Sequence, residues 1–122
     1  MPKYVSHFIY TGEAWDRMIK KPGNRALAAR ALIEEIGGTM EVFYWMLGEW
    51  DGLVIYEVPD VAAAAALSAR VASSGLLKTV ATHQLLSADE GHAALLAAKA
   101  AGTAYQPPGA QRGWHSDYDS VG

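Results

Sequence analysis

The chain has 122 residues, of which 51% are hydrophobic and 19% charged, and these proportions suit one compact domain with its own core. The formal net charge is −3, the ten Lys and Arg are scattered and no cysteine is present, which argues against nucleic-acid binding, disulfides and thiolate chemistry. Because no apolar run is long enough to span a bilayer and the N-terminus lacks a signal core, we expect a cytoplasmic protein without membrane contact.

The N-terminal part of the chain predicts a strand followed by helical segments. Residues 3–11 are dense in aromatic and β-branched side chains, which is typical of a strand. Residues 13–20 predict a short helical turn. An amphipathic helix is then expected to begin after Asn24, a good N-cap, and to end at Gly37-Gly38.

Residues 43–60, FYWMLGEWDGLVIYEVPD, predict an antiparallel β-hairpin. Two apolar, β-rich runs flank a Gly-Glu-Trp-Asp-Gly turn, and the strands are expected over residues 39–47 and 53–58. Asp60 then suits the N-cap of a second helix, which the Ser-Ser-Gly run at 73–75 ends.

The rest of the chain predicts a fourth strand, a third helix and an arm. The strand is expected over residues 78–86, and Ser87 and Glu90 have the spacing of a capping box that starts a helix. We place a domain over residues 1–102 and a C-terminal arm over residues 103–122, which have neither helical nor strand periodicity. A loose tail and a segment lying across a neighbouring subunit are both open for this arm.

The order strand, helix, strand, strand, helix, strand predicts an α+β, ferredoxin-like βαββαβ fold with an extra C-terminal helix. In this fold both helices cover one face of a four-stranded antiparallel sheet, and the first and fourth strands are neighbours. The other face is open and largely apolar whichever alternate set of side chains points to it. We therefore expect a homodimer in which two sheets face each other and close into a barrel.

The sequence resembles the GYD-domain family over roughly residues 4–90. The Gly-x-Tyr-Asp turn that names the family is present as Gly48-Glu49-Trp50-Asp51, with Trp in place of Tyr, and the segment Glu57-Val58-Pro59-Asp60 and the Gly37-Gly38 helix end also match. The resemblance implies a dimeric α/β barrel and no established activity. Relatives with the same barrel include small monooxygenases, isomerases, cyclases and heme-binding enzymes.

Two histidines are the strongest candidates for chemistry. His7 lies on the predicted first strand and His83 on the fourth, so both imidazoles can occupy one face of the sheet. We predict that one of them moves a proton during catalysis, and a structural hydrogen-bonding role is the open alternative. With Glu57 they would form a ligand set for a divalent metal, but no tight metal-binding motif is present, so we expect no metal.

The expected ligand-binding residues are mainly aromatic side chains that suit a planar or apolar molecule. They are Tyr10, Tyr44, Trp45, Trp50, Asp51 and Glu57. A place in the core is the alternative for the aromatic residues. For Asp51 the favoured interpretation is structural: it accepts backbone N–H groups while Gly48 and Gly52 adopt positive φ angles. Trp15, Glu13 and Arg17 lie where a lid over the barrel mouth would be.

These candidates predict a cofactor-free enzyme of the monooxygenase, isomerase or cyclase type that acts on a small hydrophobic or aromatic metabolite. One alternative is a non-catalytic module that binds such a molecule, or heme if an imidazole can reach the iron. Another is an assembly subunit whose open sheet face is only an interface. The sequence contains no nucleotide-binding loop and no Gly-x-Ser-x-Gly motif.

Overall fold

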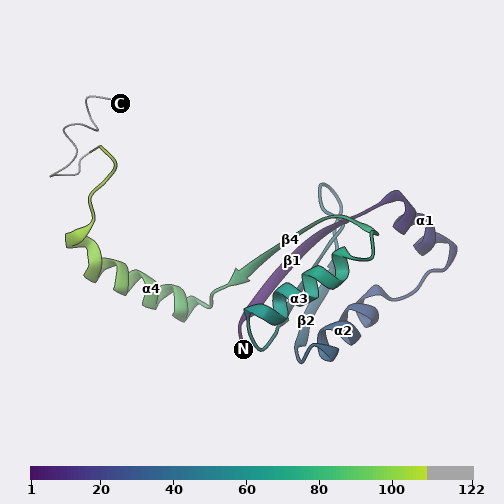
Figure 1. Ribbon diagram of the computed structural model, residues 1–122, viewed down its shortest axis with the longest axis horizontal. Helices are drawn as coiled ribbons and strands as arrows, with labels where there is room; N and C mark the ends of the chain where they lie inside the picture. The colour runs from purple at the N-terminus through teal and green to yellow at the C-terminus, as the bar shows by residue number, and fades with distance from the viewer. Residues whose placement is uncertain (110–122) are drawn as a thin grey trace. The chain divides into compact units, whose positions relative to one another are not determined.

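The computed structural model of the chain describes residues 1–109 and divides into two compact units between Leu85 and Leu86 (Figure 1). The first unit contains four strands and three helices. In the second unit the structure describes helix α4 (Ala88–Ala101) and the 3₁₀ turn η1 (Gly102–Ala104). Residues 110–122, the larger part of the predicted arm, lie outside the described residues.

The four strands form one antiparallel sheet in the order β2-β3-β1-β4. Their bounds are β1 (Lys3–Tyr10), β2 (Thr39–Trp45), β3 (Gly52–Glu57) and β4 (Leu77–Leu85). The predicted strands are confirmed with ends moved by one or two residues, and the first and fourth strands are neighbours as expected. The α+β, ferredoxin-like fold is therefore confirmed.

Side chains at the helix starts explain where the helices begin. The bounds are α1 (Gly12–Lys20), α2 (Arg25–Glu35) and α3 (Val61–Ala72). The side chains of Thr11, Asn24 and Asp60 accept hydrogen bonds from backbone N–H groups in the first turn at 3.1, 3.0 and 2.8 Å. The predicted N-caps Asn24 and Asp60 are thus confirmed.

Helix α1 is a full helix of nine residues, longer than the turn predicted from the sequence. Two surface ion pairs at i, i+4 spacing lie along it, Glu13–Arg17 at 3.0 Å and Asp16–Lys20 at 2.9 Å. The predicted capping box of α4 is also confirmed: Ser87 Oγ accepts from the Glu90 N–H at 3.0 Å and Glu90 Oε1 accepts from the Ser87 N–H at 2.8 Å.

The two faces of the sheet differ because side chains alternate along each strand. On β1, Tyr4, Ser6 and Phe8 are buried on the face that α2 and α3 cover, while the alternate residues are half-buried on the other face (Figure 1). The core lies on the covered face and includes Tyr4, Phe8, Ile33, Met40, Val54, Tyr56, Val58, Ala64 and Leu67. None of the helices among the described residues has the length and apolarity that crossing a membrane requires.

Candidate functional site

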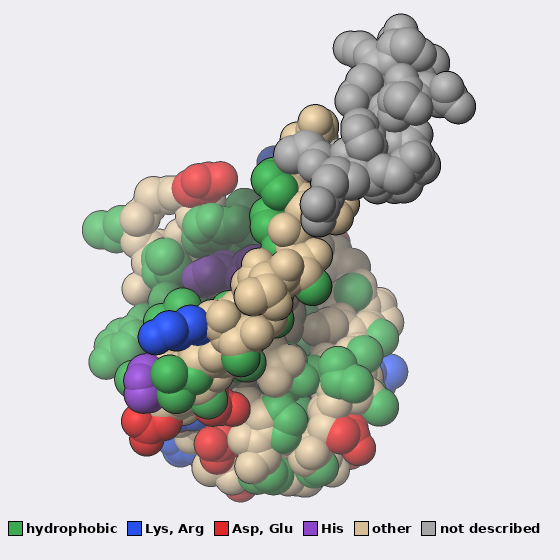
Figure 2. All heavy atoms as spheres, turned by 90° about the vertical axis from the view of Figure 1, so that its left-hand side faces the viewer, with side chains coloured by type: hydrophobic (Ala, Val, Ile, Leu, Met, Phe, Trp, Pro, Cys, Tyr) green, Lys and Arg blue, Asp and Glu red, His purple; other side chains and the backbone are tan. Residues whose placement is uncertain are grey.

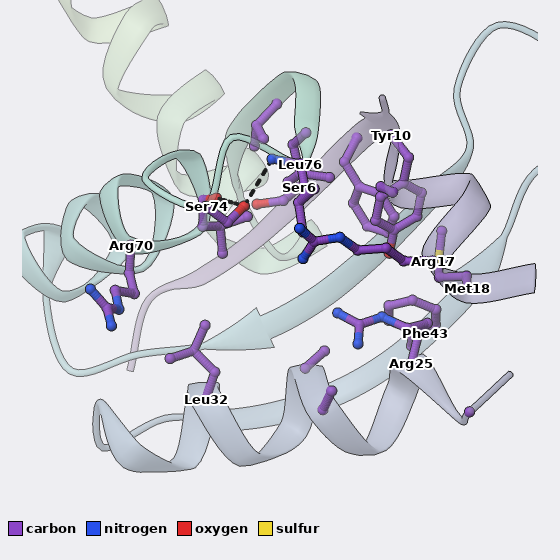
Figure 3. A pocket seen from close by; sticks show the side chains of 18 of the residues that line it. Ser6, Tyr10, Arg17, Met18, Arg25, Leu32, Phe43, Arg70, Ser74 and Leu76 are labelled. Carbon is purple, nitrogen blue, oxygen red and sulfur yellow. Dashed lines mark hydrogen bonds between the residues drawn. The ribbon is translucent and has the colours of Figure 1, made fainter. Parts of the chain in front are cut away.

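A cavity of about 760 Å³ lies between the covered face of the sheet and helices α1, α2 and α3 (Figure 3). Its volume falls in the range of small-molecule sites in proteins. The strands supply one part of the lining, Ser6, Phe8, Tyr10, Phe43, Leu77 and Val80. The helices supply another, which includes Ala14, Met18, Ala28, Ala29, Leu32, Leu67 and Val71. Most of the lining is therefore apolar.

Helix α2 contributes two alanine side chains to the lining of the cavity, beside two larger ones. Arg25, Ala28, Ala29 and Leu32 recur at intervals of three and four residues, so they lie along one face of the helix, and all four line the cavity. The alanine side chains end at Cβ. They leave space between the helix and the sheet that larger side chains would occupy.

A chain of hydroxyl groups gives this apolar cavity a polar patch. Ser6 Oγ is hydrogen-bonded to the hydroxyl of Tyr56 at 3.0 Å and to Thr82 Oγ1 at 2.8 Å. Thr82 Oγ1 lies a further 3.4 Å from Ser68 Oγ. Ser6 and Ser68 line the cavity, so these hydroxyl groups can form a hydrogen bond with a polar atom of a bound molecule.

Tyr56 anchors the hydroxyl chain from inside the core. Its side chain is 0% exposed, and this burial raises the pKa of the phenol, although the hydrogen bond from Ser6 opposes the shift. The phenol is consequently neutral at physiological pH. The sequence alone does not predict these hydrogen-bonded hydroxyl groups. The one local sign is that Ser6 lies two residues from both Tyr4 and Phe8 on β1, so its side chain points to the same buried face.

Five of the residues that line the cavity are basic and exposed, and the part of the lining that they form is called the mouth of the cavity: Arg17, Lys20, Lys21, Arg25 and Arg70. No Asp or Glu is found among the described residues that line it. Glu13 and Asp16 pair with Arg17 and Lys20 along α1.

The structure places His7 and His83 together on the open face of the sheet, away from this cavity. Their ring centroids are 5.9 Å apart, and the ring of Trp50 lies 5.5 Å from that of His7. Ser6 and Phe8, the neighbours of His7 along the strand, point to the covered face and line the cavity. The structure thus brings three of the predicted site residues together, and their catalytic or binding role stays a prediction.

Glu57 lies apart from the histidine pair. It stands opposite Lys3 in β1 and Thr39 in β2, four residues along β1 from His7. Within residues 1–109, no three His, Asp or Glu side chains converge in a way that would hold a metal ion.

The predicted aromatic residues divide between the two faces of the sheet. Tyr44 is opposite Leu53 on the open face and 62% exposed. Tyr10 lines the cavity, and its ring centroid lies 5.9 Å from that of Trp45 and 5.6 Å from that of Trp15. Trp15 and Trp45 themselves line a smaller hollow of about 400 Å³ beside α1. Of the eight predicted site residues, all of them described, Tyr10 alone lines the larger cavity.

Asp51 has the structural role that the sequence favours. Its Oδ2 accepts a hydrogen bond from the Tyr10 N–H at 2.8 Å, and its own N–H donates to the Phe8 carbonyl at 2.9 Å. These bonds tie the β2–β3 turn to the end of β1.

The expectation for the two turn glycines is half right. Gly48 has a φ of +117°, as expected, but Gly52 does not have a positive φ, so that expectation is wrong. Gly52 is required for space instead: a Cβ at this position would lie 2.6 Å from the Phe8 ring.

Comparison with known proteins gives a family and no individual relative. The GYD domain model matches residues 4–95, which span almost all of the first unit and part of α4. No curated protein and no solved structure matches the chain.

Proposed function

The chain belongs to the GYD-domain family, and from this premise we propose that it binds a small hydrophobic or aromatic molecule in the cavity between the sheet and helices α1, α2 and α3. The observation that carries the proposal is the cavity itself, about 760 Å³ of largely apolar space. Burying an apolar ligand there is favourable by about 25 cal/mol for each Å² removed from water. The hydroxyls of Ser6 and Ser68 add directional contacts within the same space.

Binding is better supported than catalysis because of the groups that line the cavity. General acid–base catalysis requires a side chain that exchanges a proton near the working pH. The described lining residues include no His, Asp or Glu. Ser6 is hydrogen-bonded to the hydroxyls of Tyr56 and Thr82, and neither of these two partners is a base of the kind that activates a serine nucleophile.

The test is binding of N-phenyl-1-naphthylamine, a neutral apolar dye whose fluorescence rises out of water. We expect saturable binding to the wild-type protein and at least about tenfold weaker binding to Ala28→Phe, because the new ring fills space in the cavity. Ala31→Phe, on the same helix but not among the lining residues, is the matched control and should bind the dye normally. No saturable binding to the wild type, or equal binding by both variants, would overturn the proposal.

A homodimer is the second part of the proposal. Val42, Ile55 and Val5 form a row across β2, β3 and β1 on the open face. All three are only half-buried in the single chain, and a second copy of the sheet would cover them. The two faces then have separate uses, one for the ligand and one for the subunit interface.

A cofactor-free enzyme of the monooxygenase, isomerase or cyclase type is a second candidate function. The proximity of His7, His83 and Trp50 on the open face favours it, because a partner subunit would enclose them. In that case the double variant His7→Ala/His83→Ala should lose turnover of a metabolite that native mass spectrometry finds co-purifying, while the dimer persists. Unchanged turnover would reject the histidines as catalytic residues.

A heme-binding module and an assembly subunit are weaker candidates. The described lining of the cavity contains no histidine that would reach a heme iron. A Soret band after heme addition that persists in the His7→Ala/His83→Ala variant would argue against those two residues as ligands. An assembly subunit would leave the cavity without a ligand, so saturable dye binding that Ala28→Phe weakens would disfavour it.

A further inference from the structure

The charge around the cavity differs from the charge of the whole chain. The chain carries a net charge of −3, yet five of its ten Lys and Arg line this one cavity, and no described Asp or Glu does. On the face seen in Figure 2, by contrast, acidic and basic side chains are scattered among hydrophobic ones. The mouth of the cavity is thus a local concentration of positive charge over an apolar interior.

Three of the five cations have no acidic partner within ion-pair distance among the described residues. Arg17 and Lys20 are already paired with Glu13 and Asp16 on α1. Lys21 follows α1, Arg25 begins α2 and Arg70 lies in the last turn of α3. No described carboxylate pairs with any of these three, which come from separate elements but line the same cavity.

The side chains are placed to meet a ligand at the mouth of the cavity. Figure 3 shows Arg17 and Arg25 extending over the cavity from α1 and α2, and Arg70 on the side of α3. A guanidinium group offers several N–H donors in one plane and forms paired hydrogen bonds with a carboxylate. A cationic ligand would meet only repulsion in the same place.

We propose that the ligand of this cavity is an amphiphilic carboxylate: an apolar body enters between the sheet and α2, and its carboxylate remains at the mouth beside Lys21, Arg25 and Arg70. This inference rests on the proposed function and adds the chemical class of the ligand. The apolar walls hold the body, and the basic mouth selects its charge and orientation.

The experiment compares three probes that share one apolar body and differ in charge. They are 1-naphthaleneacetate, its neutral amide and the cation 1-naphthylmethylammonium, and each competes with bound N-phenyl-1-naphthylamine. We expect the carboxylate to bind about tenfold more tightly than the amide, since each exposed ion pair contributes up to about a factor of five, and the cation to bind most weakly. Raising the salt concentration should reduce this preference.

A triple variant tests which cations are responsible. In Lys21→Gln/Arg25→Gln/Arg70→Gln the carboxylate and the amide should bind within about twofold of each other, with dye affinity retained. The control Arg30→Gln/Lys78→Gln/Lys99→Gln removes the same total charge at exposed positions that do not line the cavity, and it should keep the preference. Far-UV circular dichroism and the dye affinity establish that both proteins are folded.

The possible failures are distinguishable. If the wild-type protein binds the dye but prefers the amide or shows no preference, the carboxylate inference is overturned while the proposed function stands. If both triple variants lose the preference for the carboxylate over the amide to the same extent, the net charge of the protein causes that preference and the basic residues at the mouth do not. This result would also overturn the inference. Absence of saturable dye binding to the wild type would overturn the proposed function, and the inference with it.

Discussion

Asp51 Oδ2 lies 2.8 Å from the backbone nitrogen of Tyr10 and accepts its hydrogen bond. The contact joins the β2–β3 turn to the last residue of β1, where the pairing of β1 with β4 shifts register between Ile9 and Tyr10. On the other side of β1 the pairing with β3 ends at Phe8 and Gly52, so no β3 residue pairs with Tyr10, and the Asp51 carboxylate accepts from its N–H instead. Because Tyr10 also lines the cavity, the β2–β3 turn holds one part of the cavity wall in place.

Asp51→Ala should therefore destabilise the fold. We expect a loss of about 2 kcal/mol in the free energy of unfolding, since a partly buried hydrogen bond to a charged acceptor is removed. Urea denaturation measures it. Asp51→Asn keeps an acceptor oxygen and should lose less. Glu49→Ala, at an exposed position in the same turn, is the control; an equal loss in Glu49→Ala and Asp51→Ala would contradict the role of the Tyr10 contact.

Gly52→Ala should destabilise the protein by about 1 to 3 kcal/mol, because the added Cβ would lie 2.6 Å from the Phe8 ring. Phe8 lines the cavity, so a shift of its ring to relieve the contact would also change the cavity wall. Gly12→Ala is the control, since a Cβ there meets nothing within 4 Å. Urea denaturation of both variants decides the matter, and similar midpoints would show that Gly52 is not needed for space.

The buried phenol of Tyr56 predicts a pH dependence of stability. Its pKa is raised above the ordinary 10.0, chiefly by burial, so the unfolded chain releases this proton at a lower pH than the folded one. The contribution is fully present below pH 10.0 and is lost as pH rises through the folded-state pKa. At pH 8, Tyr56→Phe should be about 1 kcal/mol less stable than wild type, having lost the Ser6 hydrogen bond.

Urea denaturation at several pH values from 8 to 10.5 checks this prediction. The advantage of wild type over Tyr56→Phe should shrink at the alkaline end of this range, because only the wild-type protein carries the titrating phenol. An advantage that stays constant or grows with pH would contradict it.

Ile55→Glu should separate the subunits of the proposed homodimer. The side chain lies on the open face between Val5 and Val42, so in the dimer each copy would bury a carboxylate without a partner. We expect the dimer dissociation constant to rise by at least about 100-fold. Sedimentation velocity measures the state of association. Leu27→Glu, an exposed apolar position on α2, is the control and should leave the dimer intact; a wild-type monomer at micromolar concentration would refute the interface.

Much of the fold is predictable from the sequence because its signals are local. A cap such as Asn24, or the pair Ser87 and Glu90, acts within one turn of its own helix, so neighbouring residues suffice to locate the helix start. Helix α1 is less predictable. The i, i+4 ion pairs along it favour a helix only weakly, whereas the Pro-Gly sequence that follows it indicates an early end.

The location of the cavity is not predictable in the same way. Each alternate set of side chains on β1 mixes apolar and polar residues, so the pattern alone does not tell which set faces the helices. His7 stands between Ser6 and Phe8 in the sequence, yet its side chain is on the other side of the sheet from theirs. The choice depends on how α2 and α3 pack, which involves residues far away in the chain.

The hydroxyl chain is missed for a similar reason. Ser6, Tyr56, Thr82 and Ser68 come from β1, β3, β4 and α3, and no local motif connects them. Ser6 does not stand in a Gly-x-Ser-x-Gly motif, and nothing in the residues next to it marks it as part of a site. Its position opposite Thr82 becomes visible once the register of β1 and β4 is known.

Because side chains along β1 alternate between the ligand cavity and the proposed subunit interface, this strand should tolerate replacement of residues but not a change in length. A single-residue deletion between Tyr4 and Phe8 would invert the alternation on one side of the deletion and turn either Tyr4 or Phe8 outward. Ligand binding and the proposed dimerisation would both be impaired. Length variation within the family should therefore fall in the loops, with the spacing of β1 kept constant.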